Sequence, residues 1–512
     1  MLEQATLAPT TGPSVHPDKR GRLAGFAAWP PHRKYIAVLL ILFFAKQVFN
    51  VVVFPPFTGH DEVAHFAYIR TVADEHRIPV IPDLAEWRAA WNARKSTYPG
   101  DYLPLDLYKY QRYVLDWCCS AVDRPEFASQ PPNAMSFAGE TYPNGWQYAA
   151  NHPPLYYAVM APLYKATDSM SLERQQYVLR AAAIPIGLMV VWLTYLMAGL
   201  LFPGDRLMMM VAPTFVAFQT QFSYESAMVN NDIMLIGVFT VLVYLMIRSV
   251  RQGFTLKSSA LIGLVFGLGL LAKASMLSAA PLIALAIVLG VGIRHVRRWV
   301  TLGAVSVVVA ALVCWPWYAF LYRTYGNFSG LRQIKALQYL WTYQFESPPS
   351  IWNLLFNKGF AEMRWRETWG EFGWRLIHLD TQLLMVIGIP LLILAIAAIG
   401  GLIAGSVQRL TGRTTGHSIL VREQVIGLWV LLSVCVVAYG AMLQFGTDFR
   451  LTQARYYFNA VSAVAILLAF GLRQIVPVRY HSAAIVVFLL FMISINVLIY
   501  TQYVIPYWYL AS

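Results

Sequence analysis

Residues 57–68 read FTGHDEVAHFAY and place two adjacent carboxylates, Asp61 and Glu62, between two histidines. A carboxylate can remove a proton from a hydroxyl group, and carboxylates with imidazoles can hold a metal ion. The zinc-protease pattern H-E-x-x-H needs histidines four positions apart on one helix face. His60 and His65 are five positions apart, about 140° around a helix, so the spacing argues against zinc-protease chemistry. His60 receives no role from the sequence.

Other polar residues that bear on chemistry stand at the ends of apolar segments. A charged residue inside a bilayer costs about 2.5–3.5 kcal/mol on insertion scales, so each one suggests a function. Those that we expect on the same side as the Asp-Glu pair are His65, His152, Arg180, Asp232, Lys273, Arg366, Arg455 and Tyr456. Carboxylates facing several cations suit a site where a base removes a proton while cations hold a phosphate.

Each of these residues also has a purely structural explanation. The acidic residues Asp61, Glu62 and Asp232 can cap helices, and the basic ones can reach the lipid headgroups as interfacial anchors. His65, one turn after Asp61, can simply be its hydrogen-bond partner. A divalent ion on the carboxylates is a further alternative, because hard cations favour carboxylate oxygens, but we expect no metal. Only the collection of these residues on one side favours a functional site.

The composition is that of a membrane protein. Of the 512 residues, 58% are hydrophobic and 13% are charged, whereas soluble domains carry about 25% charged residues. Apolar runs recur along almost the whole chain, which predicts an all-α polytopic membrane protein. The four cysteines show no metal-ligand spacing.

Hydropathy predicts about eleven transmembrane helices. A helix needs about 20 apolar residues to cross a bilayer, so the apolar stretch 153–164 is too short and is predicted to be a juxtamembrane or re-entrant helix. The predicted spans are 35–54, 179–202, 206–223, 232–249, 259–276, 280–293, 299–321, 382–405, 424–444, 456–472 and 482–501.

The positive-inside rule orients these spans. Alternate loops carry Arg and Lys, whereas the short loops 224–231 and 277–279 contain neither. The basic loops are therefore predicted to be cytoplasmic, together with the amino terminus. The net charge of +13 is then mostly an orientation signal, and no nucleic-acid partner is expected.

The predicted domain organisation follows from this topology. Residues 1–34 are polar, show no cleavable signal and are expected to form a disordered cytoplasmic tail. Residues 35–512 form one transmembrane domain, with outer loops at 55–178 and 322–381. Both loops are rich in aromatic residues, which suits juxtamembrane helices lying on a bilayer surface.

An Asp-Glu pair just after the first span, in a long outer loop, resembles the GT-C superfamily of membrane glycosyltransferases. The resemblance is to the protein O-mannosyltransferases, the lipid A aminoarabinose transferases and a bacterial family that begins with D-E-x-x-H-F. The similar segments are HDEVAHFAYIRTVADEHRIP (60–79), HPPLYYAVMAPLY (152–164), SAMVNNDIML (226–235), GLGLLAK (267–273), ETWGEFGW (367–374) and QARYYF (453–458). Many relatives have Gly where this chain has Ala454, a departure that concerns the local backbone.

The resemblance implies a GT-C fold and an inverting transfer of a sugar from a polyprenyl-phosphate carrier to an acceptor hydroxyl on the extracytoplasmic face. It makes Asp61 the general base and Glu62 a supporting acid, with Lys273, Arg455 and Arg180 binding the lipid phosphate. The expected partners are a lipid-linked sugar donor, a glycan, lipid or protein acceptor, and membrane lipids, with no cofactor. The expected location is a bacterial inner (plasma) membrane.

Two other functions compete with this one. A transporter or flippase of a lipid-linked sugar would show inverted repeats and broken helices near the bilayer midplane, whereas the unusual residues here lie at span ends. A non-catalytic accessory subunit would not need carboxylates and cations on one side of the membrane. Both alternatives are therefore less favoured than an enzyme.

Overall fold

The computed structural model describes most of the chain. The described residues are 29–81, parts of 83–110, 135–137, 140–142, 147–338, 348–412, 420–449 and 452–510. The predicted cytoplasmic tail 1–34 lies outside these residues except for its end, where helix α2 (Pro31–Val53) already begins. The predicted outer loop 55–178 is described in part.

The described chain is dominated by α-helices. In addition to α2 they are α3 (Glu62–Glu75), α7 (Leu155–Ala166), α8 (Leu172–Leu201), α9 (Arg206–Phe218), α10 (Thr220–Glu225), α11 (Asp232–Gln252), α12 (Leu256–Ala272), α13 (Ala280–Val291), α14 (Val296–Tyr325), α15 (Leu331–Gln338), α16 (Ile351–Leu355), α17 (Lys358–Trp369), α18 (Thr381–Thr411), α19 (Arg422–Asp448), α20 (Val461–Ile475) and α21 (His481–Ile499).

Short helical segments and two small hairpins make up the remaining elements. The helical segments are η2 (Ala274–Ala279), η3 (Ala454–Ala460), η4 (Val478–Tyr480), η5 (Tyr500–Val504) and η6 (Pro506–Leu510). The antiparallel hairpins are β1 (Met135–Phe137) with β2 (Glu140–Tyr142), and β3 (Glu371–Phe372) with β4 (Ile377–His378). In the second hairpin Glu371 pairs with His378 and Phe372 with Ile377.

The prediction of an all-α polytopic membrane protein is confirmed. Within the described residues, nine helices are long and apolar enough to cross a membrane. The two other predicted spans, 206–223 and 259–276, correspond to the shorter apolar helices α9 and α12. The stretch 153–164, which was too short to be a span, is largely the short helix α7.

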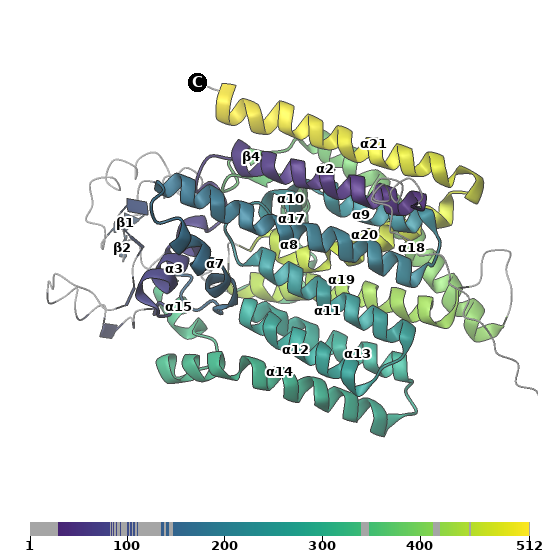
Figure 1. Ribbon diagram of the computed structural model, residues 1–512, viewed down its shortest axis with the longest axis horizontal. Helices are drawn as coiled ribbons and strands as arrows, with labels where there is room; N and C mark the ends of the chain where they lie inside the picture. Colours follow the sequence, from purple (N-terminus) through teal and green to yellow (C-terminus); the bar gives the residue numbers. More distant parts are fainter. Residues whose placement is uncertain are drawn as a thin grey trace, which may run out of the picture.

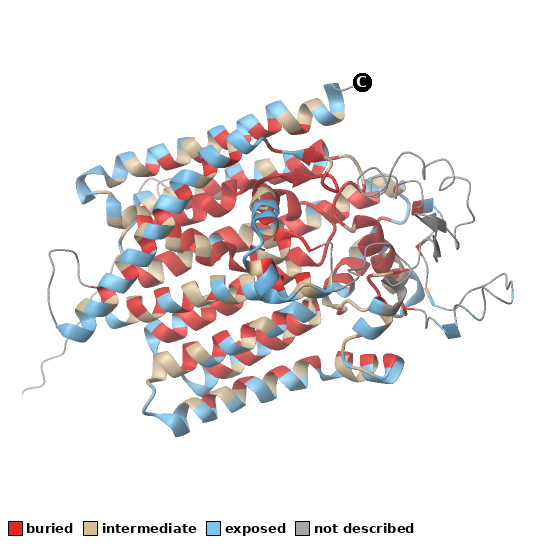
Figure 2. Cartoon of the chain, turned by 180° about the vertical axis from the view of Figure 1, so that it is seen from behind, coloured by how far each residue is buried: buried red, intermediate tan, exposed pale blue. Residues whose placement is uncertain are grey.

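Figure 1 shows that the long helices run side by side, with α3, α7 and α15 gathered at one end of them. Helix α11 lies in the middle of this bundle, because 72% of its apolar window is buried. The corresponding value is only 28% for α14 and also for α18, which therefore lie at the periphery. Buried residues accordingly concentrate along the centre of the molecule in Figure 2.

The predicted span 206–223 is broken at Gln219, between α9 and α10. A helix break leaves backbone carbonyl groups without intrahelical partners, which is costly where no water can reach them. Lys46 on α2 donates its Nζ to the Ala217 oxygen at 3.3 Å, and Asn496 on α21 donates its Nδ2 to the Phe218 oxygen at 2.7 Å. The polar residues Lys46 and Asn496 thus stabilise the break.

Helix α12 packs closely against α14. A Cβ atom on Gly263 would lie 2.4 Å from the Ser306 oxygen, and one on Gly267 would lie 2.9 Å from the Ala310 oxygen. Two glycines four positions apart allow such close approach of two helices. Helix α12 then ends at Ala272, so the predicted span 259–276 is interrupted where Lys273 adopts an extended conformation, φ −160° and ψ 140°.

Candidate functional site

Four charged residues that the sequence singled out meet at one end of the bundle. Asp61 directly precedes α3, Asp232 begins α11, Lys273 follows α12 and Arg455 lies in η3. They come from segments far apart in the sequence, and we call them the charge network. The helix ends bring them together, as the sequence predicted.

The charges of the network alternate. Arg455 donates its Nη2 to Asp61 Oδ2, and its Nη1 lies 3.5 Å from Asp232 Oδ2. Lys273 donates its Nζ to the other oxygen of Asp232, Oδ1. The ring of Tyr456 lies under both cations, with its centroid 4.9 Å from Lys273 Nζ and 5.4 Å from the Arg455 guanidinium carbon. Two carboxylates therefore balance two cations.

Asp61 is the carboxylate of the network that is open to a substrate. Its side chain is 23% exposed, compared with 3% for Asp232. The residue has a left-handed backbone, φ 60° and ψ 11°, which aspartate tolerates better than most residues. Tyr148 donates its hydroxyl to Asp61 Oδ1 at 3.0 Å. Burial alone would raise the pKa of Asp61, but Arg455 holds it below its usual range, so the carboxylate is ionised at neutral pH.

The neighbouring acid, Glu62, belongs to a different arrangement. Its side chain and that of Arg180 are fully buried. Glu62 accepts hydrogen bonds from Arg180 Nε at 2.9 Å and Nη2 at 2.6 Å, and from the backbone N–H groups of Gly59 and Val229 at 2.8 Å each. Each of the two carboxylate oxygens thus accepts two hydrogen bonds.

Arg180 is equally saturated. Besides the two bonds to Glu62, it donates to the backbone oxygens of Val51, Phe54 and Pro55. A guanidinium group has five N–H donors, and all five are used. Arg180 therefore has no donor left for a lipid phosphate, and the structure does not bring it into the charge network. The pair ties α8 to the end of α2.

Gly59 makes room for this ion pair. Its N–H donates to Glu62 Oε2, and a Cβ atom on it would lie only 2.6 Å from both Cγ and Cδ of Glu62. The Glu62 side chain cannot move away, because Arg180 holds its carboxylate. The glycine before the Asp-Glu pair is thus a packing requirement of the buried ion pair.

His65 and His152 lie close to the network, with their ring centroids 5.7 Å apart. His65 Nδ1 is 2.9 Å from the Tyr157 hydroxyl, and His152 Nδ1 is 2.7 Å from Asn231 Nδ2. Burial, followed by the charge of nearby groups, lowers the pKa of His65 to about 3 and that of His152 to about 4. Both rings are therefore neutral at physiological pH.

Arg366 is the predicted site residue that the structure leaves aside. It lies partly exposed on α17, and within the described chain no hydrogen bond or ion pair joins its side chain to the network. Its neighbours Arg364 and Arg375 instead both bind Glu367, which also accepts the Ala454 N–H at 2.8 Å. The segment 364–375 therefore supports η3 by holding the residue before Arg455.

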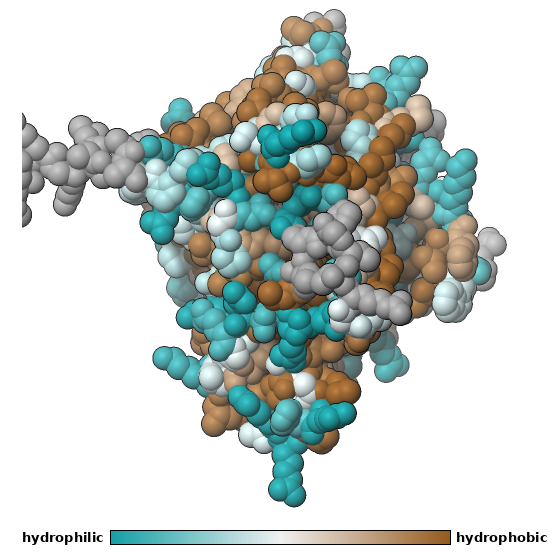
Figure 3. Space-filling model, turned by 90° about the vertical axis from the view of Figure 1, so that its right-hand side faces the viewer, coloured by the Kyte–Doolittle hydropathy of each residue, from teal (hydrophilic) through white to brown (hydrophobic). Residues whose placement is uncertain are grey.

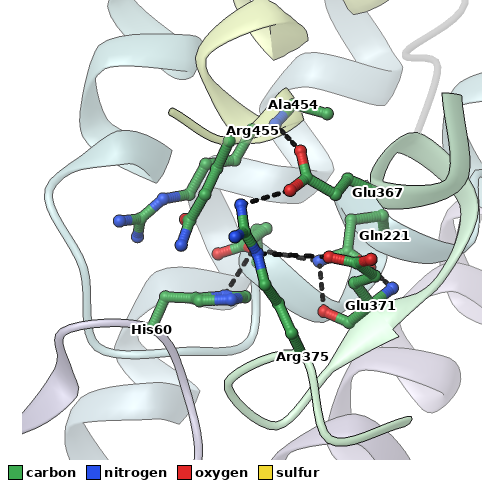
Figure 4. Close-up of a pocket in the computed structure, with 9 residues that line it drawn as sticks. His60, Gln221, Glu367, Glu371, Arg375, Ala454 and Arg455 are labelled. Atoms are coloured by element: carbon green, nitrogen blue, oxygen red, sulfur yellow. Dashed lines mark hydrogen bonds and ion pairs between the residues drawn. The ribbon is translucent and has the colours of Figure 1, made fainter. Parts of the chain in front are cut away.

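His60 lines a polar cavity behind Arg455 (Figure 4). Its Nδ1 lies 3.3 Å from Glu225 Oε1, and both side chains are buried. Figure 4 shows Glu367, Glu371 and Arg375 around the same cavity. No group of three or more metal-ligating side chains occurs in the part of the chain that the structure describes. The absence of a metal stays a prediction.

Sequence reasoning missed Tyr148, Tyr157 and the partnership of His60 with Glu225. Tyr148 is one of many aromatic residues in the segment 55–178, so nothing marks it as the one that contacts Asp61. Tyr157 lies in HPPLYY, a segment that was recognised without a role for its tyrosines. Glu225 stands at the end of α10, inside an apolar stretch, where a buried acid is itself a signal.

No family model and no curated protein matches the sequence. Among solved structures, the chain is similar to an oligosaccharyltransferase from Archaeoglobus fulgidus in complex with zinc and sulfate, with a TM-score of 0.45 and 15% identity over 90% of this chain and 52% of that one. This chain thus spans about half the length of that protein.

Two structures of ArnT from Cupriavidus metallidurans are also similar. The one bound to undecaprenyl phosphate has a TM-score of 0.34 and 14% identity over 90% of this chain and 78% of that one. The apo structure has a TM-score of 0.28 and 16% identity over 71% and 72% of the two chains. At TM-scores and identities this low, the properties of these proteins do not transfer to the site of this chain.

Proposed function

We propose that this chain is a GT-C-type glycosyltransferase that moves a sugar from a polyprenyl-phosphate carrier to an acceptor hydroxyl. The observation that carries the proposal is the charge network, in which a partly exposed carboxylate and two cations meet at one end of apolar helices. The sequence segments that resemble GT-C families supply the same residues. We place this end on the extracytoplasmic side of a bacterial inner membrane, with the amino terminus in the cytoplasm.

Lys273 and Arg455 are the proposed ligands of the carrier phosphate. Each is now paired with a carboxylate, and a phosphate is an alternative anionic partner with more oxygen atoms to offer. Cations that neutralise a departing phosphate remove the need for a general acid. Tyr456 lies under both cations and keeps them on the same side of its ring.

Asp61 is the proposed general base. When the phosphate draws Arg455 away, the pKa of Asp61 rises from its lowered value, so donor binding makes the carboxylate more basic. The acceptor oxygen then bonds to the anomeric carbon opposite the phosphate, the carbon–oxygen bond to the phosphate breaks, and the phosphate leaves with the electron pair. The acceptor proton goes to Asp61, and the anomeric configuration is inverted.

Glu62 and Arg180 act in this proposal as positioning residues. Their buried ion pair fixes the turn between α2 and α3, and that turn presents Asp61. The predicted role of Glu62 as a supporting acid is therefore indirect, and Arg180 is not part of the phosphate site.

The phosphate site can be tested without knowing the sugar. Undecaprenyl phosphate and undecaprenol differ only in the phosphate, so their binding to the purified protein should differ strongly. Lys273→Gln should weaken binding of undecaprenyl phosphate by about 10- to 100-fold, as expected for loss of a charge-assisted hydrogen bond, and leave undecaprenol binding unchanged. Equal binding of both compounds to the wild-type protein would rule out a phosphate site here.

The reaction itself requires a donor panel. Polyprenyl-phosphate carriers with different radiolabelled sugars should be tested with cell-envelope acceptors, and glycans from cells with and without the gene should be compared. Transfer of one label, with loss of the same sugar from the mutant envelope, is the expected result. If no label is transferred and the envelope loses no sugar, although the protein binds undecaprenyl phosphate, transport is favoured over transfer.

A further inference from the structure

A basic groove lies at the end of the bundle opposite the charge network. It has a volume of about 480 Å³ and separates the start of α12 from the first turns of α14. Its apolar lining includes Phe254, Leu256 and Leu302, and its polar lining includes Thr255, Arg297 and Arg298. Helix α12 runs from this groove to Lys273, so its two ends connect two distinct sites.

The positive charge of the groove is not balanced by the described residues. Among them, no carboxylate lies within ion-pair distance of Arg297 or Arg298, and the groove lining contains none. Arg298 is held in place, because its Nη2 donates to the Phe254 oxygen at 3.1 Å. Glu423, at the start of α19, is paired with Arg251 at 3.6 Å. Two guanidinium groups therefore share one groove without a carboxylate from the described part of the chain.

The start of α12 adds to this positive potential. Thr255 caps the helix through a reciprocal hydrogen-bond pair with Ser258, and the remaining N–H groups of the first turn carry the positive end of the helix dipole. Figure 3 views this end of the molecule and shows hydrophilic side chains among hydrophobic ones. A ligand that fits must carry a negative group.

The walls of the groove are suited to lipid. Leu256, which lines the groove, is 58% exposed, and the buried side chains of Phe254 and Leu302 complete its apolar lining. Leu256 begins the short apolar helix α12, and Leu302 belongs to α14, which is long and apolar enough to cross a membrane. Basic pockets between membrane helices are a known setting for anionic lipid headgroups. The two arginines and the apolar lining of the groove together suit an amphipathic ligand with an anionic headgroup.

We propose that this groove binds an anionic phospholipid, with the headgroup phosphate between Arg297 and Arg298 and the acyl chains along Leu256. The site is independent of the proposed transfer reaction and lies at the other end of the helices. A zwitterionic lipid would offer the same phosphate but would add a cation next to the two arginines, so it should bind more weakly.

The test compares lipids on the purified full-length protein. Wild-type protein in detergent is titrated with phosphatidylglycerol, phosphatidylcholine or inorganic phosphate, and bound lipid is measured by native mass spectrometry. Phosphatidylglycerol should bind best. Arg297→Gln/Arg298→Gln should weaken its binding by about 10- to 30-fold, since each basic residue near a charged surface contributes about 1 kcal/mol. Arg297→Gln alone leaves the Arg298 contact with the fold intact and should give about half of this effect on a logarithmic scale.

The matched control removes the same charge elsewhere. Arg409 lies in the last turn of α18 and Arg479 in η4, which follows α20, and neither lines the groove. Arg409→Gln/Arg479→Gln should leave phosphatidylglycerol binding within about twofold of wild type. An equal loss in this control would show general surface attraction and overturn the proposal. Equal binding of phosphatidylcholine, or equally tight binding of inorganic phosphate, would overturn it as well.

Discussion

Two adjacent acids in this chain, Asp61 and Glu62, have opposite environments. Glu62 is fully buried against Arg180, and every donor and acceptor of that pair is satisfied within the protein. Asp61 is partly exposed and shares Arg455 with a second carboxylate, Asp232. The Glu62–Arg180 pair has no unused hydrogen-bond donor or acceptor for a ligand, whereas Arg455, which is shared by two carboxylates, can exchange one of them for a ligand.

The difference shows how one short turn can serve stability and chemistry at once. Glu62 turns inward to the end of α2, and Asp61 has the left-handed backbone that begins α3. The buried pair holds this turn, so the open network does not need to be rigid by its own contacts. Variants at the two positions should therefore fail in different ways.

The largest effect is expected from Asp61→Asn. Asparagine also tolerates the left-handed backbone but cannot take a proton, so transfer should fall by about 10²- to 10⁴-fold, the usual contribution of a general base. The melting temperature should stay close to that of the wild type. Transfer is measured with the donor found in the panel experiment, and a loss of less than tenfold would contradict the role of general base.

Glu62→Gln should instead act on stability. It leaves the buried Arg180 without its counter-charge, which typically costs about 3–5 kcal/mol, and unfolding in detergent should show this loss. The double variant Glu62→Leu/Arg180→Met removes both charges but should recover little of it, because the backbone oxygens and N–H groups that the pair satisfied lose their partners. If Glu62→Gln is as stable as the wild type but inactive, the two acids have exchanged roles.

The helices and the end of the bundle where the site lies could be predicted from sequence. Long apolar runs identify membrane helices, and costly charges at their ends indicate where function concentrates. Asp61, Asp232, Lys273 and Arg455 were all identified in this way, and the structure brings them together. The breaks at Gln219 and Lys273 were missed, since hydropathy does not register a local change of backbone direction.

The partners of the charged residues could not be predicted, because they depend on tertiary contacts between distant segments. Arg180 and Arg455 appear equivalent in sequence, as each is a cation at the start of a span. One is saturated by Glu62 and three carbonyl groups, while the other joins two carboxylates. Similarly, no local signal separates Tyr148 from the other aromatic residues of its loop.

Lowering the pH should weaken the fold around the open network and spare the saturated pair. His65 is 2% exposed, and burial lowers its pKa to about 3, from the usual value of about 6.5. Below pH 6.5 the unfolded chain takes up a proton that the folded protein does not, so stability is complete above pH 6.5 and declines as the pH falls toward 3. The slope should be about 1.4 kcal/mol per pH unit for one histidine.

This dependence is measured as the free energy of unfolding in detergent between pH 7.5 and pH 4.5. His65→Gln removes the titrating group, so its stability should change less steeply with pH, whatever its absolute value. His295→Gln, at an exposed position before α14, is the matched control and should keep the wild-type slope. Identical slopes for all three proteins would show that His65 is not the group that responds.

The smallest expected effect is that of Tyr148→Phe, which removes one hydrogen bond to Asp61. A net contribution of about 1 kcal/mol per hydrogen bond corresponds to a loss of about fivefold in transfer, and the melting temperature should stay close to that of the wild type. Because the hydroxyl helps to hold the carboxylate ionised, its removal should also raise the pKa of Asp61. The acid limb of the pH–rate profile should therefore move to higher pH, and a fivefold loss without this displacement would show that the hydroxyl orients Asp61 and does not tune its basicity.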